Sequence, residues 1–316
     1  MNSRRSTGRR ASLAWQALEP LAKIADAGIP VFVVPGNHER SQLPHRRFAE
    51  HARVHIFDRP RTYAIEVRGQ RMALAGFPYE RRDIRTRFVD IVERTGWRTE
   101  HAPMRLLCMH HSVEGATVGP GNFTFTTASD VIRAADIPRG FGAVLSGHIH
   151  RHQALTRDLR GRPLAAPVLY PGSIQKTSFA ETGEGKGFLL LDLSPDEVRW
   201  SFMDLPSRPM VTRDLNAGDG TRSIASKLGQ MVAEAPADAI LRIRVAGTPD
   251  PSAWRALSAA RIRSIAPSTM TVEVRAGDGS VFGRRPLARA NRRHTGRAVT
   301  TPPPSAQLGL GGDIGG

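Results

Sequence analysis

The sequence contains a single cysteine, Cys108, so no disulfide framework can form within one copy of the chain. It also lacks any run of roughly eighteen or more apolar residues, which excludes a typical membrane-spanning helix. Cys108 lies inside a short apolar run, and a buried thiol fits a reducing compartment. These absences predict a cytoplasmic protein with no membrane segment.

The sequence also has no clear export signal. The pair Arg9-Arg10 resembles part of a twin-arginine signal, but Gln16, Glu19 and Lys23 interrupt any apolar stretch that could follow it. We therefore expect residues 1–10 to be a flexible basic start rather than a leader.

Acidic residues are scarce relative to basic ones, 29 against 45, which gives a formal net charge of +16. Such a charge favours a polyanionic partner such as DNA, because contacts from basic side chains to phosphates release counterions. Only four of the 45 basic residues are lysines, however, and an arginine-biased composition explains the charge equally well. Charge alone leaves both explanations open.

Helix and strand patterns alternate along the first part of the chain, which is typical of an α/β layer architecture. Residues 12–27 have apolar positions at helical spacing and predict a helix. Residues 29–34 form a continuous β-rich run and predict a strand buried on both faces. Residues 61–67 and 71–77 predict a hairpin, and residues 82–94 a further helix.

Later apolar runs complete this first domain, expected at residues 11–206. Residues 105–109 and 141–145 predict two more buried strands. Three further runs predict an antiparallel sheet that closes the domain, at residues 167–171, 187–193 and 198–203.

The pattern changes after the first domain. Residues 207–275 predict a small α/β cap domain in the order helix, strand, helix and strand, at residues 221–235, 239–245, 251–263 and 270–275. Residues 276–316 are rich in Gly, Pro and Arg and predict a disordered tail, because they cannot bury enough apolar surface to offset the entropy of ordering.

Polar motifs follow three of the predicted strands. Pro-Gly-Asn-His-Glu begins at Pro35, Met-His-His at Met109, and Ser-Gly-His-Ile-His at Ser146. Ligands gather at the carboxyl ends of strands in open α/β sheets, so the three motifs should converge on one site. Each is weak alone, since a lone histidine is often structural and Pro-Gly-Asn is also turn chemistry. Together their imidazoles and amide predict a site for transition metals.

This order of motifs resembles the calcineurin-like metallophosphoesterase family over residues 30–205. Residues 170–173 and 186–188 resemble its DNA repair exonuclease branch, the SbcD-type nucleases. The resemblance implies a metallophosphoesterase β-sandwich flanked by helices, here truncated at the N-terminus and followed by the cap domain. It also implies a phosphodiester hydrolase that acts on DNA with two divalent ions, manganese in particular. The partners it implies are an SbcC-type ATPase subunit and, as a further option, a second copy in a homodimer.

The resemblance also assigns roles to single residues. It makes three residues ligands of the second metal, namely Asn37, His110 and His148. His150 would bind the first metal, and His38 would be the catalytic residue that stabilises the transition state or protonates the leaving oxygen. The family uses the first histidine after this strand, so His110 is preferred to His111 as the ligand.

One departure from the family concerns its first two motifs. Its Asp-x-His and Gly-Asp segments have no counterpart before Asn37, where the only carboxylates, Glu19 and Asp26, both fall in the predicted helix. The second metal site is therefore better preserved than the first. A fragment with a misassigned start is favoured over a protein that has lost its chemistry, because the remaining ligands are present. The alternative functions are a small-molecule or nucleotide phosphoesterase and a non-catalytic DNA-binding scaffold.

Overall fold

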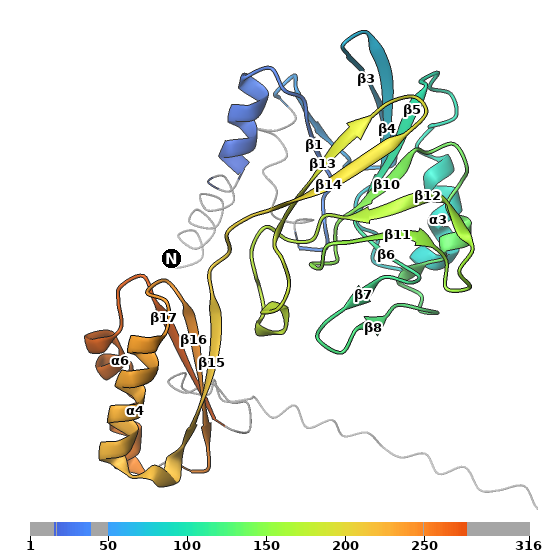
Figure 1. Ribbon diagram of the computed structural model, residues 1–316. Helices are drawn as coiled ribbons and strands as arrows, with labels where there is room; N and C mark the ends of the chain where they lie inside the picture. Colours follow the sequence, from blue (N-terminus) through green and yellow to red (C-terminus); the bar gives the residue numbers. More distant parts are fainter. Residues whose placement is uncertain (1–15, 17, 39–49, 249, 277–316) are drawn as a thin grey trace, which may run out of the picture.

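The computed structural model describes residues 16, 18–38, 50–248 and 250–276. Figure 1 shows these residues in two parts, a larger one built around a six-stranded sheet and a smaller α/β part that begins at β15. Within the described ranges, no helix is both long enough and apolar enough to span a membrane. The expected flexible start at residues 1–10 and all but the first residue of the expected tail lie outside the described residues.

The six-stranded sheet has the order β11-β12-β10-β5-β4-β3. Its strands are β3 (Arg61–Val67), β4 (Gln70–Gly76), β5 (Met104–Met109), β10 (Ala143–Ser146), β11 (Gln153–Arg157) and β12 (Pro163–Tyr170). The four central strands are parallel, and β3 and β11 run antiparallel at the two edges. The predicted hairpin and the strands that carry the histidine motifs are confirmed. The assignment of residues 167–171 to an antiparallel closing sheet is wrong, because β12 pairs in parallel with β10.

Two small sheets pack on one face of the central sheet and make a sandwich. One pairs β1 (Val31–Val33) with β2 (Val54–Ile56) in parallel, and the other is the hairpin of β13 (Gly187–Leu193) and β14 (Val198–Asp204). Phe32 packs with Leu74 and Cys108 of the central sheet. The hairpin packs through Leu189, Leu191 and Trp200, among others. Together with the helices, this arrangement confirms the predicted α/β class.

The opposite face of the central sheet is covered by α3 (Ile84–Glu93) and a series of loops. The helix buries four apolar side chains at helical spacing, Ile84, Phe88, Ile91 and Val92. This confirms the helix predicted at residues 82–94. The loops on this side contain short elements, namely β6 (Ser112–Val113), β7 (Thr117–Val118), β8 (Phe123–Thr124), β9 (Val131–Ile132) and η1 (Ala134–Asp136).

The first strand differs from its prediction. Residues 18–26 are helical as expected, and Gly28, with a φ of 91°, ends the helix. The prediction of a strand buried on both faces at residues 29–34 is wrong, because β1 spans three residues that are all only half buried. Packing covers both faces of β1, but among the described residues only β2 pairs with it, so its other edge stays open.

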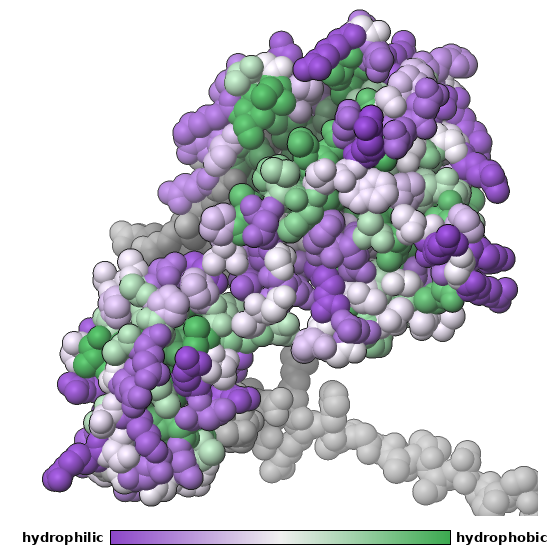
Figure 2. All heavy atoms as spheres, in the orientation of Figure 1, coloured by the Kyte–Doolittle hydropathy of each residue, from purple (hydrophilic) through white to green (hydrophobic). Residues whose placement is uncertain are grey.

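Figure 2 shows a mostly hydrophilic face with apolar residues gathered over the upper part, where Figure 1 places β13 and β14. Residues alternate along β13, so that Leu189 and Leu191 point into the sandwich while Phe188 and Leu190 stay 44% and 59% exposed. The first half of β13 is therefore apolar on both faces.

The smaller part, residues 210–276, is called the C-terminal unit below. Its parallel sheet has the order β15-β16-β17, and its elements are β15 (Met210–Asn216), η3 (Ala217–Asp219), α4 (Thr221–Glu234), β16 (Ile240–Ala246), α5 (Pro251–Ala256), α6 (Ala259–Ile265) and β17 (Thr271–Ala276). The single helix predicted at residues 251–263 is two helices. Ser258 separates them, because its hydroxyl accepts a hydrogen bond from Arg261 N and caps a new helix. No strand was predicted at the position of β15.

The helices and one face of the sheet share an apolar core, while the other face is polar. On that polar face the Arg242 guanidinium of β16 lies 3.7 Å from the ring centroid of Phe179, and its Nε donates to Glu273 Oε2 at 3.0 Å. Phe179 begins the short η2 turn (Phe179–Glu181) of the larger part. A cation–π contact therefore joins the two parts of the molecule.

Candidate metal centre

Asn37 and His110, two of the predicted ligands, meet although 73 residues separate them in the chain. Asn37 follows β1, and His110 follows β5. Asn37 Oδ1 lies 3.1 Å from His110 Nε2. Two donors that each bind one ion at about 2.1 Å are separated by about 3 Å when the angle between the bonds is near 90°. The two atoms are therefore spaced as ligands of a common ion would be.

His148 lies beside His110, with the ring centroids 5.3 Å apart and the planes at 68°. The neighbours β5 and β10 run parallel with Met109 opposite Ser146, so the two strands deliver their histidines to the same edge of the sheet. His148 has a φ of 76°, a left-handed conformation that costs a residue other than glycine about 1–2 kcal/mol. Strain of this kind persists where the surroundings hold it, commonly at functional sites.

His111 faces the opposite side of the sheet from His110, because successive residues of a strand alternate between its faces. It is 1% exposed and stacks on Tyr79, with ring centroids 4.8 Å apart. Its Nε2 accepts a hydrogen bond from Glu80 N at 3.0 Å. His111 is therefore a packed core residue whose Nε2 already has a partner.

His38 and His150 lie at the margin of the cluster. His38 is exposed, and the His150 side chain is 48% exposed. Electrostatic interaction with the histidines at positions 148, 38 and 150 adds to the lowering of the pKa of His110. The structure thus brings Asn37, His110 and His148 together and places the other two predicted residues beside them.

The central histidines are neutral near pH 7. Burial, followed by the neighbouring histidines, lowers the pKa of His110 to about 4. Burial also lowers the pKa of His148, against the opposing effect of Asp130. A neutral imidazole offers a nitrogen lone pair to a metal without first losing a proton.

The sequence was compared with those of known proteins and protein families. Residues 6–152 match the sequence profile described as calcineurin-like phosphoesterase. The matched residues, a little under half of the chain, are similar to that family. The match supports the predicted class of enzyme, a hydrolase of phosphoester bonds.

A curated relative of the chain is the DNA double-strand break repair protein Mre11 of Saccharolobus solfataricus. It is 24% identical over 207 residues, which cover 63% of this chain and 50% of the relative. The chain therefore spans about half the length of that protein. Among solved structures, a Staphylococcus aureus chain described as a 5′-nucleotidase aligns with a TM-score of 0.34 and 13% identity over 58% of this chain and 39% of its own. A likeness this weak carries no argument.

Members of the calcineurin-like family typically use two metal ions, and the residues described here fit one of them. An amide oxygen and two imidazoles suit a borderline divalent ion such as manganese, iron or zinc. Within the described ranges, however, no group of three or more His, Cys, Asp or Glu side chains could hold a metal. No carboxylate among these residues joins the cluster to bridge a second ion. The donor set therefore fits a single ion at Asn37, His110 and His148, and it does not fit the pair.

Sequence reasoning missed two groups that contact the histidines of this site. Tyr79, just after β4, stacks on His148 with ring centroids 5.7 Å apart, and its position after a strand was a usable signal. Glu181 contacts His150 from a distant turn, for which the sequence offered no signal. Burial raises the pKa of Glu181, but hydrogen bonds from Lys186, His150 and Thr177 outweigh it and lower the pKa to about 2.

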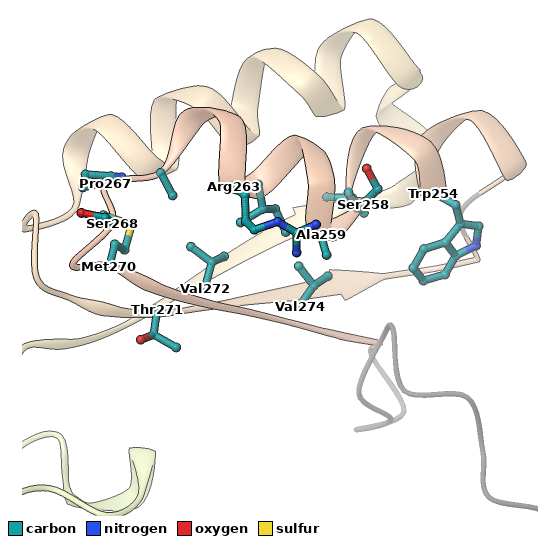
Figure 3. A pocket seen from close by; sticks show the side chains of 13 residues that line it. Trp254, Ser258, Ala259, Arg263, Pro267, Ser268, Met270, Thr271, Val272 and Val274 are labelled. Atoms are coloured by element: carbon teal, nitrogen blue, oxygen red, sulfur yellow. The ribbon is translucent and has the colours of Figure 1, made fainter.

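A cavity of about 880 Å³ lies elsewhere, between α6 and β17 of the C-terminal unit (Figure 3). Its walls are mainly apolar, with Met270, Val272 and Val274 on the strand side. None of its lining residues belongs to the metal centre. The cavity is therefore separate from the candidate metal centre.

Proposed function

We propose that this phosphoesterase is a metal-dependent phosphodiesterase that hydrolyses DNA, a nuclease of SbcD type. The observation that carries the proposal is the cluster of Asn37, which follows β1, with His110 and His148, which follow the neighbouring strands β5 and β10. The relative named as a DNA double-strand break repair protein supports DNA as the substrate. The net charge of +16 also suits a polyanion.

An ion held by Asn37, His110 and His148, manganese in our proposal, would supply Lewis-acid polarisation of a phosphoryl oxygen. The low pKa of His110 keeps its ring neutral and able to bind that ion. His38 is exposed beside the cluster, where its imidazole can hold a proton for the leaving oxygen.

The proposal extends to the setting of the protein. We place it in the cytoplasm, because its one thiol is buried and its sequence can form no internal disulfide. An SbcC-type ATPase subunit and a second copy of the chain are its proposed partners. The two parts of the structure are proposed to fold as the domains expected at residues 11–206 and 207–275.

A second function is favoured by one observation, the lack of a bridging carboxylate among the described residues. A non-catalytic DNA-binding scaffold would need no such group. It predicts salt-sensitive binding to DNA without cleavage in any divalent metal.

The test compares hydrolysis of linear duplex DNA and of a small phosphodiester by the full chain with manganese. His38→Ala should lower the rate about 10²–10⁴-fold and leave DNA binding unchanged, because it removes only the proton donor. His101→Ala, at another exposed histidine, is the control and should keep full activity. Binding without cleavage would favour the scaffold. Turnover of the small diester far above that of DNA would favour a small-molecule phosphoesterase.

A further inference from the structure

The C-terminal sheet has an open edge at β17, beside the apolar cavity of Figure 3. Thr271 N donates to Ala239 O at 2.9 Å, so the backbone of Thr271 faces β16. Successive residues of a strand turn their N–H and C=O groups to opposite sides, so those of Val272 and Val274 point away from β16. In the ranges that the structure describes, no strand pairs with β17 on that side. An edge of this kind is a template for a further strand.

The same two valines line the cavity. In Figure 3 the side chains of Val272 and Val274 point toward α6, and the walls of the cavity of about 880 Å³ also include Trp254, Leu257 and Ile262. A groove between a helix and an open strand edge suits an extended peptide, because the edge pairs with the peptide backbone and the groove accepts alternate side chains. A small apolar molecule would use the apolar walls alone. An extended peptide is therefore the class of ligand that uses both features.

The helical wall of this groove is basic. Helices α5 and α6 contain Arg255, Arg261 and Arg263 and neither contains an Asp or a Glu. Arg263 is exposed and lines the cavity, and Figure 3 shows its side chain directed from α6 toward β17. The one carboxylate of β17, on Glu273, is on the polar face of the sheet, where it pairs with Arg242. The groove therefore favours a segment that carries carboxylates beside its apolar side chains.

The charge of the chain itself argues against two other occupants. Residues 277–316, which follow β17 in the sequence, contain six arginines and two aspartates. A second copy of the chain would bring a formal net charge of +16. Like charges across an interface disfavour association, so an acidic segment of another protein fits the groove better than either.

We propose that the groove between α6 and β17 binds an extended, acidic segment of another protein, which adds to the sheet as a strand beside β17. The backbone of this segment pairs with the open edge at Val272 and Val274, and its apolar side chains enter the cavity. A carboxylate on the same face of the segment lies against Arg263. The site is separate from the candidate metal centre and does not depend on the proposed function.

The test uses the full chain and a synthetic peptide, acetylated and amidated, of sequence Thr-Glu-Thr-Val-Thr-Val-Thr-Glu. When this peptide is extended, its valines and glutamates share one face, so a carboxylate flanks the valines in either strand direction. We expect calorimetry to detect binding. Hydrogen exchange followed by NMR should show the amides of Val272 and Val274 protected at least about tenfold by the peptide. The same peptide with lysines in place of its glutamates should bind at least about tenfold more weakly.

Variants of two exposed residues test the walls of the groove. Arg263→Glu should weaken binding of the acidic peptide about tenfold and strengthen binding of the lysine peptide, because it reverses the charge at the helical wall. Ala259→Phe puts a ring into the cavity that Ala259 lines, so it should weaken binding of both peptides. Arg213→Glu is the matched control. It makes the same change of charge at an exposed residue of β15, at the opposite edge of the sheet, and should alter neither affinity.

Several results would overturn the proposal. A dissociation constant above about 1 mM for the acidic peptide, or equal affinities for the two peptides, would show that the groove does not select such a segment. Binding that leaves the exchange of the Val272 and Val274 amides unchanged would exclude strand addition. Protection of these amides in the free chain at every protein concentration would assign the groove to residues 277–316. Protection that rises with protein concentration would assign it to a second copy. None of these measurements involves hydrolysis of DNA, which tests the proposed function by itself.

Discussion

The imidazole of His110 lies directly against the backbone of Gly147. A Cβ at residue 147 would come 2.5 Å from His110 Nδ1 and 3.1 Å from Cε1, closer than real Cβ contacts allow. The other nitrogen of the same ring faces Asn37 Oδ1. The position of the ring between its two neighbours therefore depends on residue 147 having no side chain.

Gly147→Ala should push the His110 ring away from its present position and weaken manganese binding. We expect at least about a tenfold loss of affinity by calorimetry, and a loss of about 1–3 kcal/mol in the free energy of unfolding from overpacking. Gly121→Ala is the control, because nothing lies within 4 Å of an added Cβ there. Wild-type affinity in Gly147→Ala would show that the ring adapts and that the contact is unimportant.

His111 should make the stability depend on pH. Burial lowers its pKa to about 3 from the 6.5 of an unfolded chain, so the unfolded state binds a proton that the native state excludes. The stabilisation is complete above pH 6.5 and is lost as the pH falls toward 3. His111→Gln should flatten the slope of the free energy of unfolding between pH 6 and 4 by up to about 1.4 kcal/mol per pH unit.

Urea denaturation at a series of pH values measures that slope. The control is His101→Gln, at an exposed histidine, which should keep the wild-type slope. Equal slopes in wild type and His111→Gln would contradict a neutral buried imidazole.

Cys108 should be inert in the folded protein. Burial raises its pKa to about 12, so at pH 8 almost none of it is thiolate, and the side chain is out of reach of reagents. A chromogenic disulfide reagent should label the native protein at least about 100-fold more slowly than the protein in denaturant. Because the chain has one cysteine, labelling above this rate would report opening of the sheet at β5.

The parts of the site that lie at strand ends were predictable from the sequence. Asn37, His110 and His148 each follow an apolar run. The parallel strands β5 and β10 bring the two histidines to one edge of their sheet, while Asn37 arrives from β1 in a separate sheet. The choice between His110 and His111 also follows from strand alternation, since the residue in phase with Leu107 and Met109 enters the core. Local sequence patterns are sufficient to predict a site residue when it directly follows a strand.

Contacts between distant segments could not be predicted. Glu181 meets His150 across 31 residues, and it lies in a glycine-rich stretch that is typical of a solvated loop. Lys186 is fully buried although lysines rarely are, so its burial could not be predicted from the neighbouring residues. The break between α5 and α6 was missed because a helical pattern continues through Ser258, where the capping bond decides the outcome.

The stacking of Arg242 on Phe179 has a thermodynamic consequence. The same three-residue turn carries Phe179 at one end and Glu181 at the other, so the C-terminal sheet and the His150 ring share one support. Anything that draws Arg242 away from this turn would also disturb the carboxylate that contacts the His150 ring. By reciprocity, whatever holds the His150 ring against Glu181 would favour the contact between Arg242 and Phe179 by the same free energy. The position of the His150 ring and the movement of the C-terminal unit would then be two readings of one equilibrium.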